Sequence, residues 1–143
     1  MKRIMKLIIG STLCLANIGY CANAATDSSS ETYKNQRGST MTLAWHANSR
    51  NTGTLTGTFT TAVGNCPQDV GIPMPLAGFF NGNAVAITVN FPHCKQVVAM
   101  VGNLTDNKNS LHTIWLDANQ AEDPRGKNWN SNIVGSDTYQ KMG

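Results

Sequence analysis

Charged residues are scarce in this chain of 143 residues, where Asp, Glu, Lys and Arg make up 13%, about half the share usual in globular proteins. Aromatic residues are also few, at 7%. No apolar run reaches the roughly 20 residues that a membrane-spanning helix needs. These shortages exclude a multi-span membrane protein and a highly charged disordered chain. Thr, Asn, Ser and Gly dominate instead, which favours a single β-rich domain with many turns.

The net charge of +3 arises from the N-terminus alone. Lys2, Arg3 and Lys6 are three of the 11 basic residues, and no acidic residue lies among the first 24 residues. The rest of the chain holds eight basic and eight acidic residues. A neutral domain lacks the electrostatic field that binds nucleic acid or an anionic membrane, so we expect neither as a partner.

Residues 1–24 have the organisation of a secretory signal peptide. An apolar stretch from Leu7 to Cys21 follows the basic residues, and Ala22-Asn23-Ala24 matches an A-x-A cleavage site. The stretch is too short, and too often interrupted by polar residues, for a membrane anchor. We therefore expect cleavage near Ala24 and a secreted protein, extracellular or periplasmic, with a flexible polar tail over residues 25–31.

Two cysteines, Cys66 and Cys94, remain after such a cleavage. Export places them in an oxidising compartment, where a disulfide is the expected state. A metal site is a poor alternative, because structural zinc takes four ligands and His93 would supply only a third. We therefore predict a disulfide and no metal.

Apolar and polar residues alternate along most of the mature chain. In residues 84–91, for example, Val85, Ile87 and Val89 fall on one face. Such period-two patterning predicts half-buried strands, and clusters of Asn and Gly between them predict turns. Eight strands are predicted, at residues 32–36, 40–46, 54–60, 75–80, 84–91, 96–104, 110–117 and 131–140.

Eight antiparallel strands with short connections can close into an up-and-down barrel, whose interior holds side chains or one small ligand. A β-sandwich is the structural alternative. No segment shows helical periodicity of useful length, although residues 124–130 could form one short turn. The predicted fold is therefore all-β, an eight-stranded antiparallel up-and-down β-barrel over residues 32–143.

Five motifs resemble, in order, those of the avidin and streptavidin family. They are Asn35–Thr40 (NQRGST), Gly57–Asn65 (GTFTTAVGN), Trp115-Leu116, Trp129 and Val134–Tyr139 (VGSDTY). The resemblance covers about residues 32 to 141, nearly all of the mature chain. It implies the same barrel and a non-covalent complex with biotin, without a reaction and without a cofactor.

Biotin is a neutral bicyclic urea with a thioether and a valerate tail. Burying a urea is costly unless its carbonyl and both N–H groups are paired. By resemblance, Asn35 and Ser39 donate to the urea oxygen, and Thr61 and Asp137 accept from the two N–H groups. Phe59 stands where the family has a third donor, usually a tyrosine, and a phenylalanine side chain has no proton to donate.

A loop and two tryptophans complete the site that the resemblance implies. Val63, Gly64 and Asn65 match the loop that closes over the biotin tail, with the Asn65 backbone meeting the carboxylate. Trp115 matches an inner wall of the pocket. Trp129 matches the tryptophan that is lent to the pocket of a neighbouring subunit.

The second half of the chain departs from the family pattern. Phe91 and Met100 lie where tryptophans line the cavity, and Gln96 and Val98 lie where Ser and Thr contact the tail and the sulfur. Asp117 replaces an apolar residue. Strand alternation points Asp117 inward, and we expect a solvated carboxylate at the mouth. These changes predict biotin binding weaker than in the tight members, or a pocket that has drifted to another small ligand.

An enzyme is not expected. Asp117 and Asp137 could be imagined as an acid pair of the glycosidase kind, but no nucleophile, base or metal constellation accompanies them. A structural or adhesive secreted barrel that binds nothing small is a third alternative, and it would require a filled barrel interior.

Outward-facing side chains predict assembly. Val101, Ile114 and Leu116 would expose an apolar patch, which usually marks an interface, and a lent Trp129 implies a neighbour. The Cys66–Cys94 pair resembles the inter-loop disulfide of the family's small dimeric bacterial branch, which generally lacks the lent tryptophan. We predict a homo-oligomer, with a tetramer preferred and a dimer possible.

Overall fold

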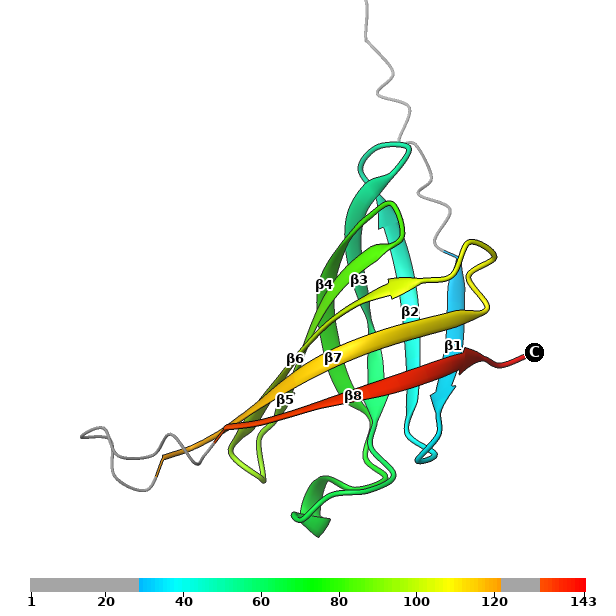
Figure 1. Ribbon diagram of the computed structural model, residues 1–143. Helices are drawn as coiled ribbons and strands as arrows, with labels where there is room; N and C mark the ends of the chain where they lie inside the picture. The colour runs from blue at the N-terminus through cyan, green and yellow to red at the C-terminus, as the bar shows by residue number, and fades with distance from the viewer. Residues whose placement is uncertain (1–28, 122–131) are drawn as a thin grey trace, which may run out of the picture.

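The computed structural model describes residues 29–121 and 132–143, which form one closed antiparallel barrel. Each strand pairs with the next along the chain, and the last returns to pair with the first (Figure 1). The strands are β1 (Ser30–Asn35), β2 (Thr40–Ala47), β3 (Thr52–Thr60), β4 (Met74–Asn81), β5 (Ala84–Phe91), β6 (Gln96–Leu104), β7 (Ser110–Asn119) and β8 (Asn132–Lys141).

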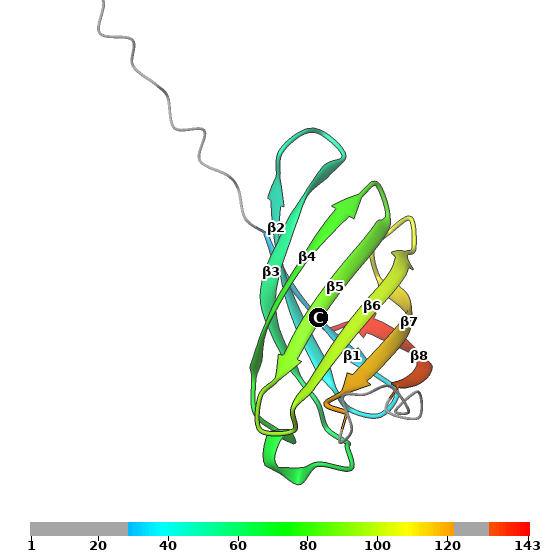
Figure 2. The same cartoon turned by 90° about the vertical axis from the view of Figure 1, so that its left-hand side faces the viewer.

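The predicted strands and fold class are confirmed. All eight predicted strands are present, and their ends differ from the prediction by at most two residues. Closure of the ladder through Asn35 and Tyr139 excludes the β-sandwich, because a sandwich has two separate sheets. Figure 2 shows the wall that β3 to β6 form. Among the described residues, no helix is long and apolar enough to cross a membrane.

Some predicted segments fall outside the part of the chain that the structure describes. The predicted signal peptide, most of the predicted tail and the short turn at 124–130 lie outside the described residues. The end of the predicted tail is wrong, because residues 30–31 already belong to β1. A short 3-10 helix, η1 (Pro67–Asp69), was not predicted, since three residues carry no periodicity.

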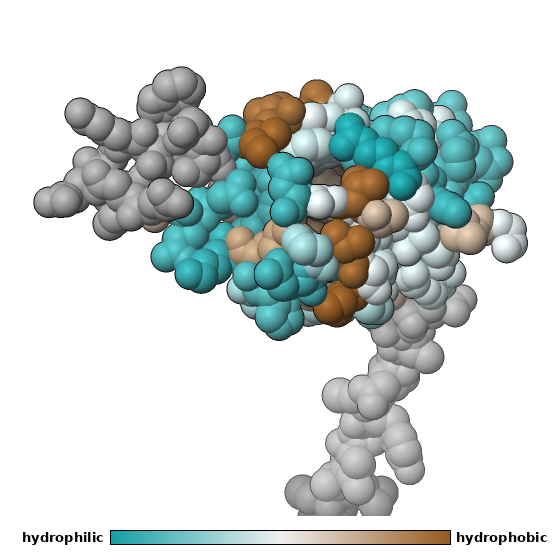
Figure 3. Space-filling model, turned by 90° about the horizontal axis from the view of Figure 1, so that it is seen from below, coloured by the Kyte–Doolittle hydropathy of each residue, from teal (hydrophilic) through white to brown (hydrophobic). Residues whose placement is uncertain are grey.

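The two ends of the barrel differ. The long β3–β4 connection with η1 lies at the lower end in Figure 1, together with the β1–β2 and β5–β6 turns. Figure 3, seen from that end, shows apolar side chains set among hydrophilic ones. At the opposite end, Trp45 and Phe80 pack edge to face with ring centroids 5.1 Å apart. Lys108 lies 4.9 Å from the Trp45 ring, so this end is closed by a packed plug.

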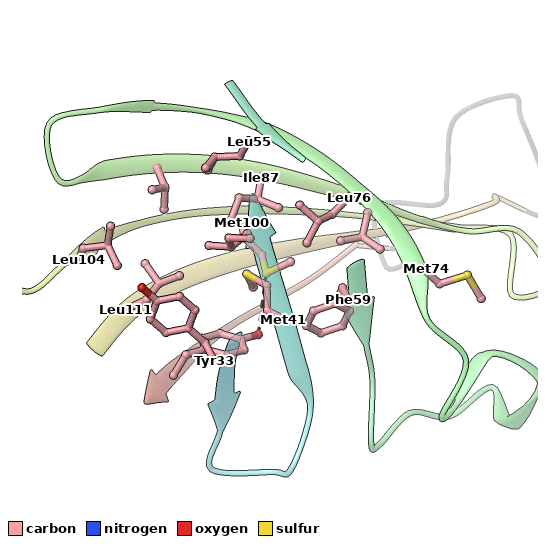
Figure 4. Packing of buried hydrophobic residues seen from close by; sticks show 14 of the residues in the cluster. Tyr33, Met41, Leu55, Phe59, Met74, Leu76, Ile87, Met100, Leu104 and Leu111 are labelled. Carbon is pink, nitrogen blue, oxygen red and sulfur yellow. Dashed lines mark hydrogen bonds between the residues drawn. The ribbon is translucent and has the colours of Figure 1, made fainter. Parts of the chain in front are cut away.

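The core runs along the barrel axis because every second side chain points inward. In β5, Val85, Ile87, Val89 and Phe91 are buried and the intervening residues are exposed, as predicted. Figure 4 shows Met41 lying between Tyr33 and Phe59 in this core. The apolar packing fills the end near the Trp45 plug and leaves the other end for a cavity.

Candidate ligand-binding site

A cavity of about 470 Å³ opens at the end that carries the β3–β4 loop. This volume is within the range typical of small-molecule sites. Fourteen of the predicted site residues line the cavity: Asn35, Ser39, Phe59, Thr61, Val63, Gly64, Asn65, Phe91, Gln96, Val98, Met100, Trp115, Asp117 and Asp137. The remaining one, Trp129, lies outside the described residues. The fold therefore brings together residues that are more than 100 positions apart in the sequence.

Two buried side chains, Asn35 and Ser39, line the part of the cavity that we call its floor. Both are held as hydrogen-bond donors. Oδ1 of Asn35 accepts from the backbone N–H groups of Arg37 at 3.0 Å and Ser39 at 2.8 Å. The amide NH₂ of Asn35 is therefore the part that donates, and one of its partners is the Tyr139 hydroxyl oxygen. The Ser39 hydroxyl oxygen accepts from the backbone N–H of Ala62 at 3.0 Å, which leaves its own proton for another partner. Both side chains are buried and prearranged for an acceptor atom.

Two other cavity residues are held as acceptors. The Thr61 hydroxyl donates to the backbone carbonyl of Val63 at 2.5 Å, so its lone pairs are what it offers to a ligand. Oδ1 of Asp137 accepts from the side-chain amide of Gln36 at 2.7 Å and lies 3.6 Å from Nε of Arg37. These two partners fix the carboxylate through one oxygen, and the other oxygen can accept from a ligand.

The walls between donors and acceptors are apolar. Phe59 and Phe91 pack edge to face, with centroids 6.1 Å apart and planes at 86°. The Trp115 indole lies against Gly135, where an added Cβ would come within 2.2 Å of the ring. Glycine at this position in β8 therefore makes room for the indole at the cavity wall. Such walls suit the faces of a flat apolar ring system.

The expected solvated carboxylate at Asp117 is wrong, because the residue is buried, with 7% of it exposed. The expected inward direction is correct: Asp117 lies on the same face of β7 as Thr113 and Trp115. Gln96 donates to its Oδ2, while its Oδ1 has no partner among the described residues. Burial raises the pKa of Asp117 above the ordinary aspartate value, against the opposing hydrogen bonds from Gln96 and Asn119.

The loop over the mouth is tied to the barrel at two points. The predicted disulfide joins Cys66 to Cys94, with Cα atoms 5.9 Å apart. Beside it, the buried Asp69 of η1 accepts from the Cys94 backbone N–H at 3.1 Å and lies 2.5 Å from Nδ1 of His93. Oxidised sulfurs have no thiolate for a metal, so this cluster serves to hold the loop.

Sequence reasoning missed four cavity residues that come from strands or turns: Arg37, Asn119, Ile133 and Tyr139. The alternation of β7 and β8 could have found two of them, because Asn119 follows Asp117 and Tyr139 follows Asp137 by two positions. No pattern in the sequence indicates that the Arg37 side chain turns back over Asp137 from the β1–β2 loop.

The comparison with known families decides which barrel this is. The model of the Avidin family matches residues 23–142, most of the chain. The chain belongs to the avidin family. Avidin-family proteins bind biotin and are not enzymes. Biotin is therefore the ligand against which the donors, acceptors and apolar walls of the cavity are to be compared.

Solved avidin structures support the assignment. The structure of core-bradavidin is 26% identical, with a TM-score of 0.66, and the match covers 80% of this chain and 100% of that one. A complex of short afifavidin with biotin is 27% identical, with a TM-score of 0.61, covering 79% of this chain and 88% of that one. The rhizavidin–biotin complex is 24% identical, with a TM-score of 0.64, and the match covers 81% of this chain and 94% of that one. At this identity the likeness supports only the fold. No curated protein sequence matches this avidin-family chain.

Proposed function

We propose that this protein binds biotin non-covalently, one molecule in each barrel, without a reaction or a cofactor. The observation that carries the proposal is the convergence of preset donors and acceptors. Asn35 and Ser39 offer N–H and O–H protons at the cavity floor, because their acceptor oxygens are already used by the backbone. Thr61 and Asp137 offer lone pairs at the same cavity. A cyclic urea needs this combination, since unpaired buried polar groups are costly.

Binding is proposed to be weaker than in the tight members of the family and to be exchangeable. Phe91 and Met100 offer less aromatic area than the tryptophans that the resemblance places there. At about 25 cal/mol per Å², a loss of some tens of Å² at each position removes roughly 1–3 kcal/mol. Val98 cannot donate to the ligand sulfur, which removes another contact. Together these losses correspond to roughly one to three powers of ten in affinity.

Calorimetry of the mature chain with biotin tests the proposal. We expect one site per chain and a complex that exchanges when competing biotin is added. Ser39→Ala is expected to weaken binding, because it removes a floor donor. Ser49→Ala is the matched control, since among the described residues the Ser49 hydroxyl bonds to the Thr52 hydroxyl in the exposed β2–β3 turn and does not line the cavity. No binding by the wild type at high micromolar biotin would contradict the proposed function.

Export and assembly belong to the same proposal. A secreted, disulfide-bonded homo-oligomer, with a tetramer preferred over a dimer, fits an apolar outer face on β6, β7 and β8. Val101 is paired with Ile114, and Leu116 is paired with Val134, across neighbouring strands. Each of these side chains is about half exposed or more in the single chain, and patches of this kind usually mark interfaces.

A different small ligand is the second candidate, and Asp117 is the observation that favours it. Its unpaired oxygen could accept from a donor group that biotin lacks at this wall, after a small rotation of the carboxyl. The nearby Trp115 indole N–H is likewise buried without a partner in the described part of the chain. A thermal-shift screen with amine-bearing heterocyclic ureas distinguishes the two: stabilisation by such a ligand, with none by biotin, favours the second.

A further inference from the structure

Tyr139 belongs to the cavity floor, although no sequence motif drew attention to its hydroxyl. It lies in β8 at the seam that closes the barrel, directly opposite Asn35 of β1. It lines the same cavity as Asn35 and Ser39. Like Ser39, which is 2% exposed, Tyr139 is almost inaccessible to water, at 0%, because it lies at the bottom of the cavity.

The Tyr139 ring crosses the floor from one wall of the barrel toward another. Its hydroxyl lies 3.9 Å from the sulfur of Met100, which belongs to β6 and not to a strand paired with β8. A thioether is a weak acceptor, so among the described residues the phenol proton has only a poor partner, while the phenol oxygen accepts from the Asn35 side chain. Burial raises the pKa of Tyr139 and the Asp137 carboxylate raises it further, against the opposing effects of a hydrogen bond from the Asn35 side chain and the Arg37 charge, so the hydroxyl keeps its proton. Rotation about the C–O bond is all that is needed to turn this proton toward the cavity.

We propose that Tyr139 is a ligand-binding residue whose hydroxyl donates the third hydrogen bond to the ligand's carbonyl oxygen, beside Asn35 and Ser39. The proposal rests on the proposed function and names a contact within that site. Phe59 in β3 has no hydroxyl to donate, and the Tyr139 hydroxyl from β8 takes over that role in the same cavity. Three convergent buried donors around one carbonyl oxygen hold it more strongly than two.

Tyr139→Phe tests the proposal with the least change of shape. We expect the Kd for biotin to rise roughly tenfold to a hundredfold, as expected for the loss of one buried hydrogen bond. Tyr33→Phe is the matched control. Tyr33 is also 0% exposed, but its hydroxyl proton is shared between the Glu31 carboxylate and the Lys108 carbonyl, and the residue does not line the cavity. Its Kd is expected to stay within twofold of the wild type.

Two further measurements separate a ligand contact from a packing effect. With the thiocarbonyl analogue of biotin, whose sulfur is a poor acceptor, Tyr139→Phe is expected to lose less than threefold. Phe59→Tyr is expected to tighten biotin binding at least fivefold in the Tyr139→Phe background, and by a smaller factor in the wild type, where the third donor is already present.

The outcomes distinguish this proposal from the proposed function. If the wild type binds biotin and Tyr139→Phe binds it equally well, the donor role of Tyr139 is refuted while biotin binding stands. Equal losses for the carbonyl and thiocarbonyl ligands would also refute it, since a packing defect affects both. If the wild type does not bind biotin at all, both the proposed function and the Tyr139 contact are wrong.

Discussion

The side-chain amide of Gln96 donates to Oδ2 of Asp117, and Oδ1 of the same carboxyl is buried without a partner among the described residues. The two side chains come from neighbouring strands, β6 and β7, and both line the cavity. A buried carboxylate that accepts hydrogen bonds at only one of its two oxygens is poorly stabilised in its ionised form. We therefore expect this carboxyl to make ligand binding sensitive to pH.

Biotin affinity is expected to fall as pH rises. Burial already raises the pKa of Asp117 in the free protein, and a ligand that displaces cavity water raises it further. Binding therefore takes up a proton in the window between the free and bound pKa values, and affinity decreases through that window as pH increases. Calorimetry with the uncharged biotin amide, in buffers of different ionisation enthalpy, measures this proton uptake without interference from the valerate carboxyl.

Asp117→Asn is the control for this pH dependence, because it keeps the shape and removes the titration. Its affinity for biotin amide is expected to be flat from pH 4 to pH 8. Arg37, Asp69 and Asp137 also line the cavity. If the slope persisted in Asp117→Asn, Asp117 would not be its source and the prediction would be wrong.

The Cys66–Cys94 disulfide is expected to stabilise the fold and slow ligand release. The two residues are 28 positions apart, and closing a loop of this length contributes roughly 3–4 kcal/mol in the chain-entropy model. Denaturant unfolding with and without reductant measures the difference. Reduction should also increase the biotin off-rate, because Val63, Gly64 and Asn65 adjoin the bond. In the Cys66→Ser/Cys94→Ser variant, neither the unfolding free energy nor the off-rate should change with reductant. Two labelled thiols in the unreduced, denatured wild type would disprove the disulfide.

Asp69 is expected to matter more for stability than its exposed neighbours in the loop. It is 1% exposed and holds the Cys94 backbone N–H and the His93 ring. Asp69→Ala leaves that N–H without its acceptor, which should cost about 1–3 kcal/mol of unfolding free energy. Gln68→Ala, at the neighbouring exposed position, is the comparison. Equal unfolding midpoints for the two variants would show that the cluster does not hold the loop.

The outer face of β6 and β7 is expected to be an interface between copies of the chain. Val101 and Ile114, paired across the two strands, are 57% and 60% exposed in the single chain. Val101→Glu/Ile114→Glu places charges there and should reduce the mass measured by light scattering at micromolar concentration. Thr58→Glu, on the exposed face of β3, should not. A monomeric mass for the wild type would remove the basis for assembly.

Most of the barrel could be predicted from the sequence, because strand alternation is local. The pattern of β5 records in eight consecutive residues which side chains point inward, and the same holds along β7, including Asp117. The family motifs then placed Asn35, Ser39, Thr61 and Asp137 in one site, and all four line one cavity. Their roles toward biotin remain predictions that the experiments above address.

By itself the sequence determined the order and facing of the strands, the pairing of Cys66 with Cys94, and most of the side chains that line the cavity. Only the tertiary structure decided that Asp117 is buried with half of its carboxyl unpaired, and that the Tyr139 hydroxyl reaches across the floor. The physical reason is that the direction in which a side chain points is set by alternation along its own strand. Solvation and hydrogen-bond partners instead depend on side chains that other strands bring in when the barrel closes.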